Sequence, residues 1–571
     1  MKPISRITSS LKSGILLGAA YFLSDAFGAF LAIGQLFDPK LETFLLMGVA
    51  ALFTIGPAML LSLIWSHTLG RYLVLAEFKN STKGALFIAL MVGVSVLGYG
   101  LRVSRVQSTA QSVAAVAAES PVPVLWIVID TLRADTLYGD ALSFPHAPAL
   151  KQLANDSHVF TDAEASAGWT LPSVATLLTG IHPTTLYSAR GYLPNWAPTA
   201  AQRLKRAGYQ THAFMDNYLL ERRNGFASGF DTFFQKSALR FAFTFPGFRL
   251  IPTRLRETLR EELEIFYYGG KGLTDSAIAK MQTMGPATPF YYVHYMDVHY
   301  PYYEHPEVSP DPVGTEPVQL HYAMEAARQT GATPNSAQMK FLRHRYEGEL
   351  KALDPHIGRL LEHWDQQFGQ ESLIIVTSDH GEEFLEHGEL GHGNSLYKEL
   401  VHVPLIMRLP LSLRAEAKPK ADPTAVGIVD ILPTTLDVLG ISAVPDTDFL
   451  GVQGESLLPW MQGTAPAPDR GIYATQNRHQ RRIYRWRTQE HTYINRYDHK
   501  GKSAPVGRSE LYNKAQDYDE RDDLFKTSPQ IATDSQKALS KFVAEQEKDR
   551  DPKPVTTEAN IDAMKALGYI E

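Results

Sequence analysis

The stretch PVPVLWIVID, residues 121–130, decides the fold class of this chain. It is a continuous apolar run that ends in an acid, which is typical of a strand buried on both faces of a parallel sheet. The runs FYYVHYMDVH at 290–299 and SLIIVTSDHGEE at 372–383 have the same form. Helical patterns accompany them, APTAAQRLKRAGY at 197–209 and a longer one at 339–367. Strands that alternate with helices predict an α/β domain with a mostly parallel central sheet flanked by helices.

Polar residues end these apolar runs, and ligands of such sheets bind at the carboxyl ends of the strands. Asp130 ends the first run, and Asp379 and His380 end the third. Thr170 precedes Pro172 in the segment GWTLPSVATLLTG. Because threonine favours helix caps and proline the first helical turn, we expect Thr170 at a helix N-terminus. Backbone N–H groups and the helix dipole stabilise an anion there.

Histidines form a second group of candidates. His294 and His299 lie with Asp297 at the end of the second run, and His387 and His392 lie in a glycine-rich loop after the third. Imidazole groups in such a position can act as general acids. Each also has an ordinary structural interpretation, because loop histidines often only satisfy local hydrogen bonds.

The composition limits the chemistry. A net charge of -6 shows no sign of the basic face that nucleic-acid binding requires, so no nucleic-acid partner is expected. The absence of cysteine excludes disulfides, thiolate ligands and a cysteine nucleophile. Any metal must therefore be held by carboxylates, histidines and hydroxyls, which favours a divalent cation such as Zn, Mn, Ca or Mg.

The first hundred residues have the character of a membrane anchor. Apolar runs occur at 13–37, 43–65 and 84–100. About 20 apolar residues are needed to cross a bilayer, so the first two runs qualify and the third is borderline. A signal peptide is the alternative for the first run. We predict a transmembrane anchor of about three helices over residues 1–103 and a linker over 104–120.

The lysines and arginines around these runs indicate an orientation. They precede the first run and lie between the second and the third, whereas the intervening loop holds only Lys40. By the positive-inside rule, the N-terminus is inside a bacterial-type inner or plasma membrane. The large domain is then extracytoplasmic (periplasmic). If the third run does not cross the membrane, this orientation reverses.

Two further parts are predicted beyond the linker. The main α/β domain is expected over residues 121–465 and a smaller subdomain over residues 466–571. The second part contains short strand-like pieces, RGIYAT, RIYRWRT and HTYINRYD, followed by a polar stretch and a helical segment. This pattern predicts an antiparallel subdomain with a closing helix.

These segments, taken in order, resemble the sulfatase family within the alkaline-phosphatase superfamily. Each motif is weak alone, but their order along the chain from about residue 122 is specific. The resemblance implies the fold of that superfamily and rests on VIDTLRADTLYGD, GWTLPSVATLLTG, HYMDVHYPYY, SDHGEEFLEHGELGHGNSLY, VDILPTTLDVLGI, GESLLP, ELYNKAQDYDERDDLF and MKALGYIE.

The resemblance also implies roles for the residues at matching positions. Asp130, Asp379 and His380 would bind the metal. Thr170 would occupy the nucleophile position and also contact the metal. These roles agree with the chemistry of the side chains, because a divalent cation activates a hydroxyl and screens an anionic substrate.

The remaining matches concern the substrate. His299 and His392, and with less support His387, would bind the anionic group or protonate the leaving group. Trp169 would line the substrate pocket, although it could equally serve only to pack. The implied substrate is an anionic phospho- or sulfo-ester.

The departures from the family pattern bear on the reaction. Usual sulfatases carry Cys or Ser at the position of Thr170, and this residue is oxidised to formylglycine, which threonine cannot yield. Val174 stands where the motif has arginine, and Thr131 where it has a second acid. Threonine is instead typical of membrane-anchored relatives such as phosphoethanolamine and phosphoglycerol transferases, which form a phosphothreonine intermediate. The former usually rely on cysteines, which this chain lacks.

Three functions follow as hypotheses. The first is a metal-dependent transferase that moves a phospho-headgroup from a membrane lipid to a cell-envelope acceptor through a covalent Thr170 intermediate. The alternative is a hydrolase of phosphate esters, or less readily sulfate esters, that uses the same site with water as acceptor. The last is a non-catalytic binding protein that keeps the fold.

Overall fold

The computed structural model describes residues 121–186, 193–194, 196–217, 219–235, 269–300, 302, 305–309, 334–414, 421–442, 451–478, 481–498 and 509–548. The predicted anchor and linker lie outside these residues and stay predictions. Within the described ranges, no helix combines the length and the apolar character needed to cross a membrane. The boundary expected near residue 465 also stays a prediction.

A nine-stranded, mostly parallel sheet forms the centre of the described chain, as predicted. The neighbours of the central strand β1 run parallel to it, whereas β9 is antiparallel to both of its neighbours. In spatial order the strands are β10 (Ala421–Asp422), β2 (His158–Glu164), β9 (His402–Arg408), β6 (Leu373–Thr377), β1 (Val124–Ile129), β5 (Pro289–Tyr295), β3 (Gln210–Met215) and β4 (Thr232–Gln235), with β11 (Val426–Gly427) beside β2.

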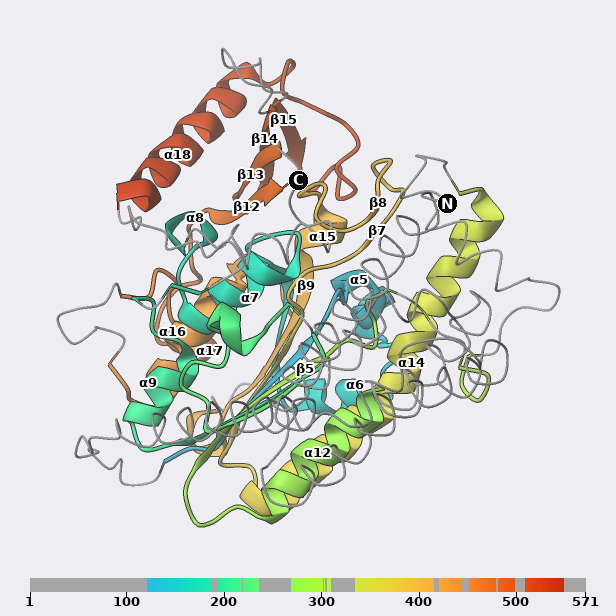
Figure 1. The fold of residues 1–571 in the computed structure, drawn as a ribbon. Helices are drawn as coiled ribbons and strands as arrows, with labels where there is room; N and C mark the ends of the chain where they lie inside the picture. The colour runs from blue at the N-terminus through green and yellow to red at the C-terminus, as the bar shows by residue number, and fades with distance from the viewer. Residues whose placement is uncertain are drawn as a thin grey trace, which may run out of the picture. The chain divides into compact units, whose positions relative to one another are not determined.

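Helices cover both faces of this sheet, which explains why β1 is apolar throughout. Alternate residues of β1 enter two separate cores, Trp126 in one and Ile127 in the other. One face carries α7 (Thr170–Thr179), α8 (Pro183–Leu186), α9 (Ala200–Arg206), α16 (Ile431–Val438) and α17 (Leu458–Met461). The other carries α5 (Ala134–Tyr138), α6 (Pro148–Asn155), α12 (Gly270–Gln282) and the long α14 (Ser336–Phe368) (Figure 1).

A second, antiparallel sheet follows in the C-terminal part, also as predicted. Its strands are β12 (Ile472–Arg478), β13 (Arg481–Arg487), β14 (His491–Asp498) and β15 (Ser509–Asn513), in sequence order. The closing helix α18 (Pro529–Lys548) packs on it through Ala532 and Leu539 (Figure 1). Short elements complete the description: β7 (Glu383–Phe384), β8 (Leu390–Gly391), α15 (Lys398–Val401) and single turns at Asp140–Leu142, Arg222–Asn224, Leu411–Leu413 and Ile428–Asp430.

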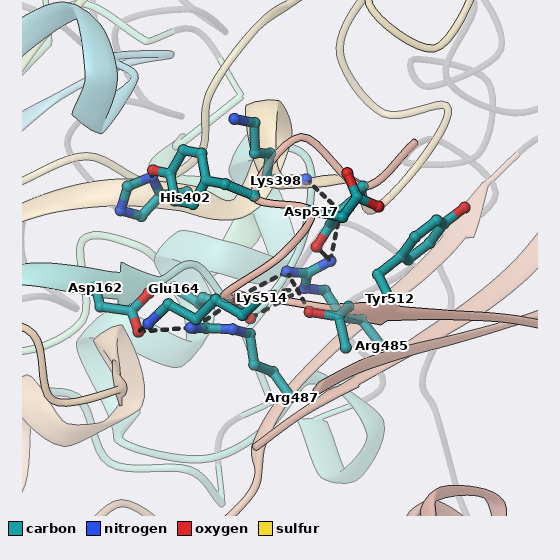
Figure 2. Close-up of a pocket in the computed structure, with 12 residues that line it drawn as sticks. Asp162, Glu164, Lys398, His402, Arg485, Arg487, Tyr512, Lys514 and Asp517 are labelled. Carbon is teal, nitrogen blue, oxygen red and sulfur yellow. Dashed lines mark hydrogen bonds and ion pairs between the residues drawn. The ribbon is translucent and has the colours of Figure 1, made fainter. Parts of the chain in front are cut away.

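Buried ion pairs join the two sheets. Figure 2 shows side chains of the C-terminal sheet directed at the acids of β2. Arg485 is 1% exposed and contacts Glu164 and Glu520, each at 2.8 Å. Arg487 lies 2.5 Å from Asp162, which Lys514 also contacts. We call this cluster of Asp162, Glu164, Arg485, Arg487, Lys514 and Glu520 the inter-sheet network. It attaches the second sheet to β2, which lies next to the edge of the first sheet.

Candidate active site

The three predicted metal ligands converge at the carboxyl ends of two adjacent strands. Asp130 follows β1, and Asp379 and His380 follow β6 after a short link. Because β1 and β6 are parallel neighbours, their ends meet at the same edge of the sheet. All three side chains are fully buried, and each offers one ligand atom within 4.8 Å of the others.

The two oxygens of Asp130 have different environments. Oδ2 accepts hydrogen bonds from Nδ2 of Asn217 at 2.7 Å and from Nε2 of His294 at 3.1 Å. The ring of His294 is held in turn by the hydroxyl of Tyr292 at 2.9 Å from Nδ1. Oδ1 has no hydrogen-bond partner among the described residues. The carboxylate is therefore oriented through one oxygen and presents the other to the cluster.

Asp379 and His380 repeat this arrangement. Oδ1 of Asp379 accepts from the backbone N–H groups of Thr131 and His380, whereas its Oδ2 has no donor among the described residues. Nδ1 of His380 lies 2.9 Å from the carbonyl oxygen of Gly381, so it carries the proton. The lone pair of Nε2 then faces the cluster, 3.7 Å from Oδ1 of Asp130 and 3.5 Å from Oδ2 of Asp379.

The electrostatics of this cluster call for a cation. Burial raises the pKa of Asp379, and the negative charge of Asp130 raises it further. Burial also opposes the ionisation of Asp130, but the hydrogen bond from His294 holds its pKa below the ordinary value. Two buried carboxylates with unpaired oxygens are unfavourable unless a cation compensates them. Two carboxylate oxygens and a neutral imidazole fit a divalent metal ion such as zinc or manganese.

Thr170 lies at this cluster, as predicted. It is the first residue of α7, with Trp169 rather than Thr170 in the cap position. Its Oγ1 is 3.3 Å from Nε2 of His380. The first turn of α7 is hydrogen-bonded to the segment after β6, because the hydroxyl of Ser173 donates to the carbonyl oxygen of Asp379. The hydroxyl of Thr170 is thus held beside the ligand atoms by the helix itself.

Thr131, at the family's second acid position, has a strained backbone. Its φ of 59° lies in the left-handed region that β-branched residues avoid. The hydroxyl donates to the carbonyl oxygen of Val298 at 2.9 Å, and the backbone N–H reaches Oδ1 of Asp379 at 3.3 Å. The strained turn after β1 therefore orients Asp379, which is typical of functional sites.

His299 and His392 lie together beside the ligands. Their ring centroids are 5.0 Å apart, and the ring of His392 lies 4.6 Å from that of His380. Nδ1 of His392 contacts Oε1 of Glu382 at 2.8 Å, and the hydroxyl of Tyr302 donates to Oε2 at 2.9 Å. A carboxylate partner at Nδ1 fixes the tautomer and leaves Nε2 for other contacts.

His387 has both ring nitrogens engaged away from this cluster. Nδ1 lies 2.5 Å from Oε1 of Glu399, Nε2 lies 2.8 Å from the carbonyl oxygen of Glu520, and the ring stacks on Tyr397. Burial opposes a charge on His387, but the contact with Glu399 raises its pKa. These contacts connect the His387 loop to the C-terminal part of the chain through Glu520. The predicted catalytic role of His387 stays a prediction, and these contacts give it a structural task.

The structure adds residues that the motif analysis did not single out. Asn217 follows β3, and Glu382 follows His380 in the third run. Both stand just beyond a strand end, which is the signal that could have identified them. Trp169, the predicted pocket residue, is 2% exposed, and the guanidinium carbon of Arg478 lies 5.2 Å from its ring centroid.

Known proteins are similar to this chain in sequence. A family model described as Sulfatase matches residues 123–441. The iduronate 2-sulfatase of Homo sapiens is 27% identical over 339 residues, 50% of this chain and 59% of that enzyme. The N-acetylglucosamine-6-O-sulfatase of Bacteroides thetaiotaomicron is 31% identical over 219 residues, 36% of each. The match spans less than two thirds of either relative.

A solved structure shares the fold. The phosphonate monoester hydrolase of Agrobacterium radiobacter aligns with a TM-score of 0.57 at 18% identity. The alignment covers 74% of this chain and 96% of that one. At this identity the likeness concerns the fold, which agrees with the central sheet and the C-terminal antiparallel sheet described above.

Proposed function

The chain belongs to the sulfatase family, because the family match covers more than half of its 571 residues; on this premise we propose that it is a metal-dependent hydrolase of phosphate or phosphonate esters, with Thr170 as nucleophile. One observation carries the proposal. The hydroxyl of Thr170 lies 3.3 Å from Nε2 of His380, within a ligand set whose two carboxylates each keep one oxygen to which no described residue donates.

The metal-binding residues would be Asp130, Asp379 and His380, with the hydroxyl of Thr170 beside them. A divalent cation bound there would lower the pKa of that hydroxyl and neutralise part of the substrate's negative charge. Asn217 and His294 orient Asp130 from behind, and such supporting contacts are often as important as the ligands themselves.

The reaction would take place in two displacements. Oγ1 of Thr170, as the alkoxide after its proton has passed to solvent, attacks the phosphorus atom, a Thr170–phosphorus bond forms, and the bond to the ester oxygen breaks. The departing oxygen takes a proton from Nε2 of His392, whose Nδ1 is held by Glu382. Water then attacks the phosphothreonine and gives its proton to the same histidine, and Thr170 is released. His299, next to His392, would bind the non-bridging oxygens.

Phosphorus esters are favoured over sulfate esters by the nucleophile. Threonine cannot become formylglycine, so the attacking group remains a simple hydroxyl. Hydrolysis is favoured by the relatives, which are named as sulfatases and as a phosphonate monoester hydrolase. Their particular substrates are not assigned to this chain.

Transfer of a phospho-headgroup from a membrane lipid is a second candidate. Threonine at the nucleophile position supports it, together with the apolar runs in residues 1–103, which would place the domain at the outer surface of a bacterial membrane. The chemistry differs only in the second step, where an alcohol replaces water. Vesicles of phosphatidylglycerol or phosphatidylethanolamine with glycerol as acceptor would separate the two, since only a transferase forms the new phosphodiester faster than free product.

The test is a pair of matched variants of the full chain. Thr170→Val removes the proposed nucleophile, and Thr176→Val removes a buried hydroxyl of the same helix that has no hydrogen-bond partner among the described residues. We expect Thr170→Val to lose nitrophenyl phosphodiester and phosphonate turnover, and Thr176→Val to keep it. Intact mass should show a phospho-adduct on the wild type and on Thr176→Val, and none on Thr170→Val. Metal-loaded wild type with no turnover on any ester would favour the binding-protein hypothesis.

A further inference from the structure

The C-terminal sheet places a guanidinium group against the candidate active site. Arg478 is the last residue of β12. Its guanidinium carbon lies 5.2 Å from the ring centroid of Trp169, the residue before Thr170. It also lies against Gly393, the residue after His392, because a Cβ atom built on that glycine would come within 2.2 Å of Nη1. Arg478 therefore lies between the segments that carry the nucleophile and the acid.

Backbone and side-chain contacts hold β12 in this position. Nε2 of Gln476 donates to the carbonyl oxygen of Gly393 at 2.8 Å, and the backbone N–H of Thr475 donates to the carbonyl oxygen of Ser166 at 3.0 Å. One contact ties the strand to the His392 loop, and the other ties it to the segment before Thr170. The end of β12 is thus fixed relative to both.

Val174, which stands at the arginine position of the sulfatase motif, is fully buried in the apolar core on the α7 face of the sheet. Among the described residues of α7 there is no arginine or lysine. A positive side chain must therefore come from another element.

We infer that Arg478 binds the anionic group of the substrate, so that the C-terminal sheet supplies the guanidinium that α7 lacks. The inference rests on the proposed function for the nature of the substrate. A guanidinium over an aromatic ring is attracted to the face of the ring, and its rigid planar fork presents several N–H donors in one plane. Two such donors match two oxygens of a tetrahedral anion. The other reading is an arginine that only packs on Trp169.

The experiment measures binding of inorganic phosphate to the full chain loaded with Mn²⁺ or Zn²⁺, by calorimetry. The variants are Arg478→Gln and Arg478→Lys. The control is Arg482→Gln, because Arg482 pairs with Asn477 in the register of β12 and β13 and so projects from the opposite face to Arg478. Metal content and melting temperature are measured for each variant as checks on folding.

We expect Arg478→Gln to weaken phosphate binding about tenfold or more, since it loses a charge-assisted bidentate contact. The phosphate affinity of Arg478→Lys should be intermediate, because lysine keeps the positive charge but lacks the planar pair of N–H donors. The phosphate affinity of Arg482→Gln should equal that of wild type. Equal phosphate affinity in Arg478→Gln and Arg482→Gln would overturn the inference, even if ester hydrolysis continued. Arg478-dependent phosphate binding without hydrolysis of any ester would support the inference and reject the proposed function instead.

Discussion

Two buried clusters of acids lie in this molecule, and they differ in how their charge is compensated. In the inter-sheet network, Asp162, Glu164 and Glu520 each contact a side-chain cation of the C-terminal sheet (Figure 2). At the candidate active site, Asp130 and Asp379 each keep one oxygen with no donor among the described residues. Burial of acids therefore does not by itself mark a functional site. Two such acids within one ligand set call for a cation, because an unpaired buried charge requires a partner.

One acid of each cluster shows the difference in its pKa, which is lowered for Asp162 and raised for Asp379. Burial opposes the ionisation of Asp162, but Arg487 lowers its pKa to about 2. Burial and the charge of Asp130 both raise the pKa of Asp379. The network is thus complete within the protein, whereas the site is complete only with a cation. Changes in the two clusters should accordingly have opposite consequences for stability and for activity.

The largest effect is expected from Asp379→Asn. Loss of a metal ligand should reduce ester turnover by at least about a thousandfold, because several kcal/mol of charge stabilisation is removed. The metal-free variant should be at least as stable as metal-free wild type, since a repulsive buried charge is gone. Chelator should lower the melting temperature of wild type and leave that of the variant unchanged. A metal-free Asp379→Asn that melts well below metal-free wild type would contradict this account of the cluster.

Arg485→Met should have the opposite profile. It leaves Glu164 and Glu520 without their fully buried partner, and breaking such a pair destabilises a protein by about 3–5 kcal/mol. Urea unfolding should show this loss, whereas the variant that remains folded should still bind metal. Arg482→Met is the matched control from the same strand. Adding Glu164→Gln and Glu520→Gln to Arg485→Met should recover stability, and a failure to recover would mean that packing rather than charge dominates.

This contrast also explains what the sequence could predict. The strands, and the position of Asp130, Asp379 and His380 at one edge of the sheet, were predictable because apolar runs that end in polar residues place those residues at the carboxyl ends of parallel strands. Their proposed role as metal ligands came from the resemblance to the sulfatase family. The inter-sheet network could not be predicted from the sequence, because Glu164 and Arg485 are 321 positions apart. In β13, the face with Ile483, Arg485 and Arg487 is more buried than the face with Tyr484 and Trp486. Hydropathy alone would assign these faces the other way.

The sequence also could not predict which residues of a loop lie at the candidate active site. His387 and His392 lie five residues apart in one glycine-rich segment, and the sequence pattern gave both the same chemistry. The structure places His392 beside His299 and His380, whereas His387 contacts Glu399 and Glu520. Nothing in the spacing reveals this difference, because the path of the loop depends on β12 and on the turn after β15.

Adjacent residues Glu382 and Glu383 have different surroundings, because Glu382 contacts His392 whereas Glu383 accepts from the backbone N–H groups of His387 and Glu389. Glu383 gives a prediction on pH. Burial and the charge of Glu399 raise the pKa of Glu383 to about 7 from an ordinary value of 4.5. Because the pKa of Glu383 is higher in the folded than in the unfolded chain, this residue stabilises the folded protein fully below about pH 4.5. This stabilisation is lost as the pH rises through 7. The difference amounts to at most about 3 kcal/mol.

Glu383→Gln should remove this dependence. Its free energy of unfolding should exceed that of wild type at pH 8, and the difference should shrink toward pH 5. Glu362→Gln, at an exposed position of α14, is the control. Urea unfolding at several pH values measures the difference between variant and wild type, so that other titrating groups cancel. A difference that does not change with pH would show that Glu383 is ionised in the folded protein.

Glu382→Gln should have the smallest effect, about tenfold on kcat, which corresponds to about 1.4 kcal/mol. The variant keeps the size of the side chain and loses the carboxylate charge that holds Nδ1 of His392. If Glu382 positions a proton donor, the loss must depend on the leaving group, because an alkoxide needs the proton more than a nitrophenolate does. We therefore expect the tenfold loss of kcat on alkyl esters and almost none on nitrophenyl esters, with KM unchanged. Tyr302→Phe removes only the hydrogen bond to Oε2 of Glu382, so it should show a smaller loss with the same dependence on the leaving group. An equal loss on both classes of ester would reduce Glu382 to a structural contact, and the proton would then have to come from His299.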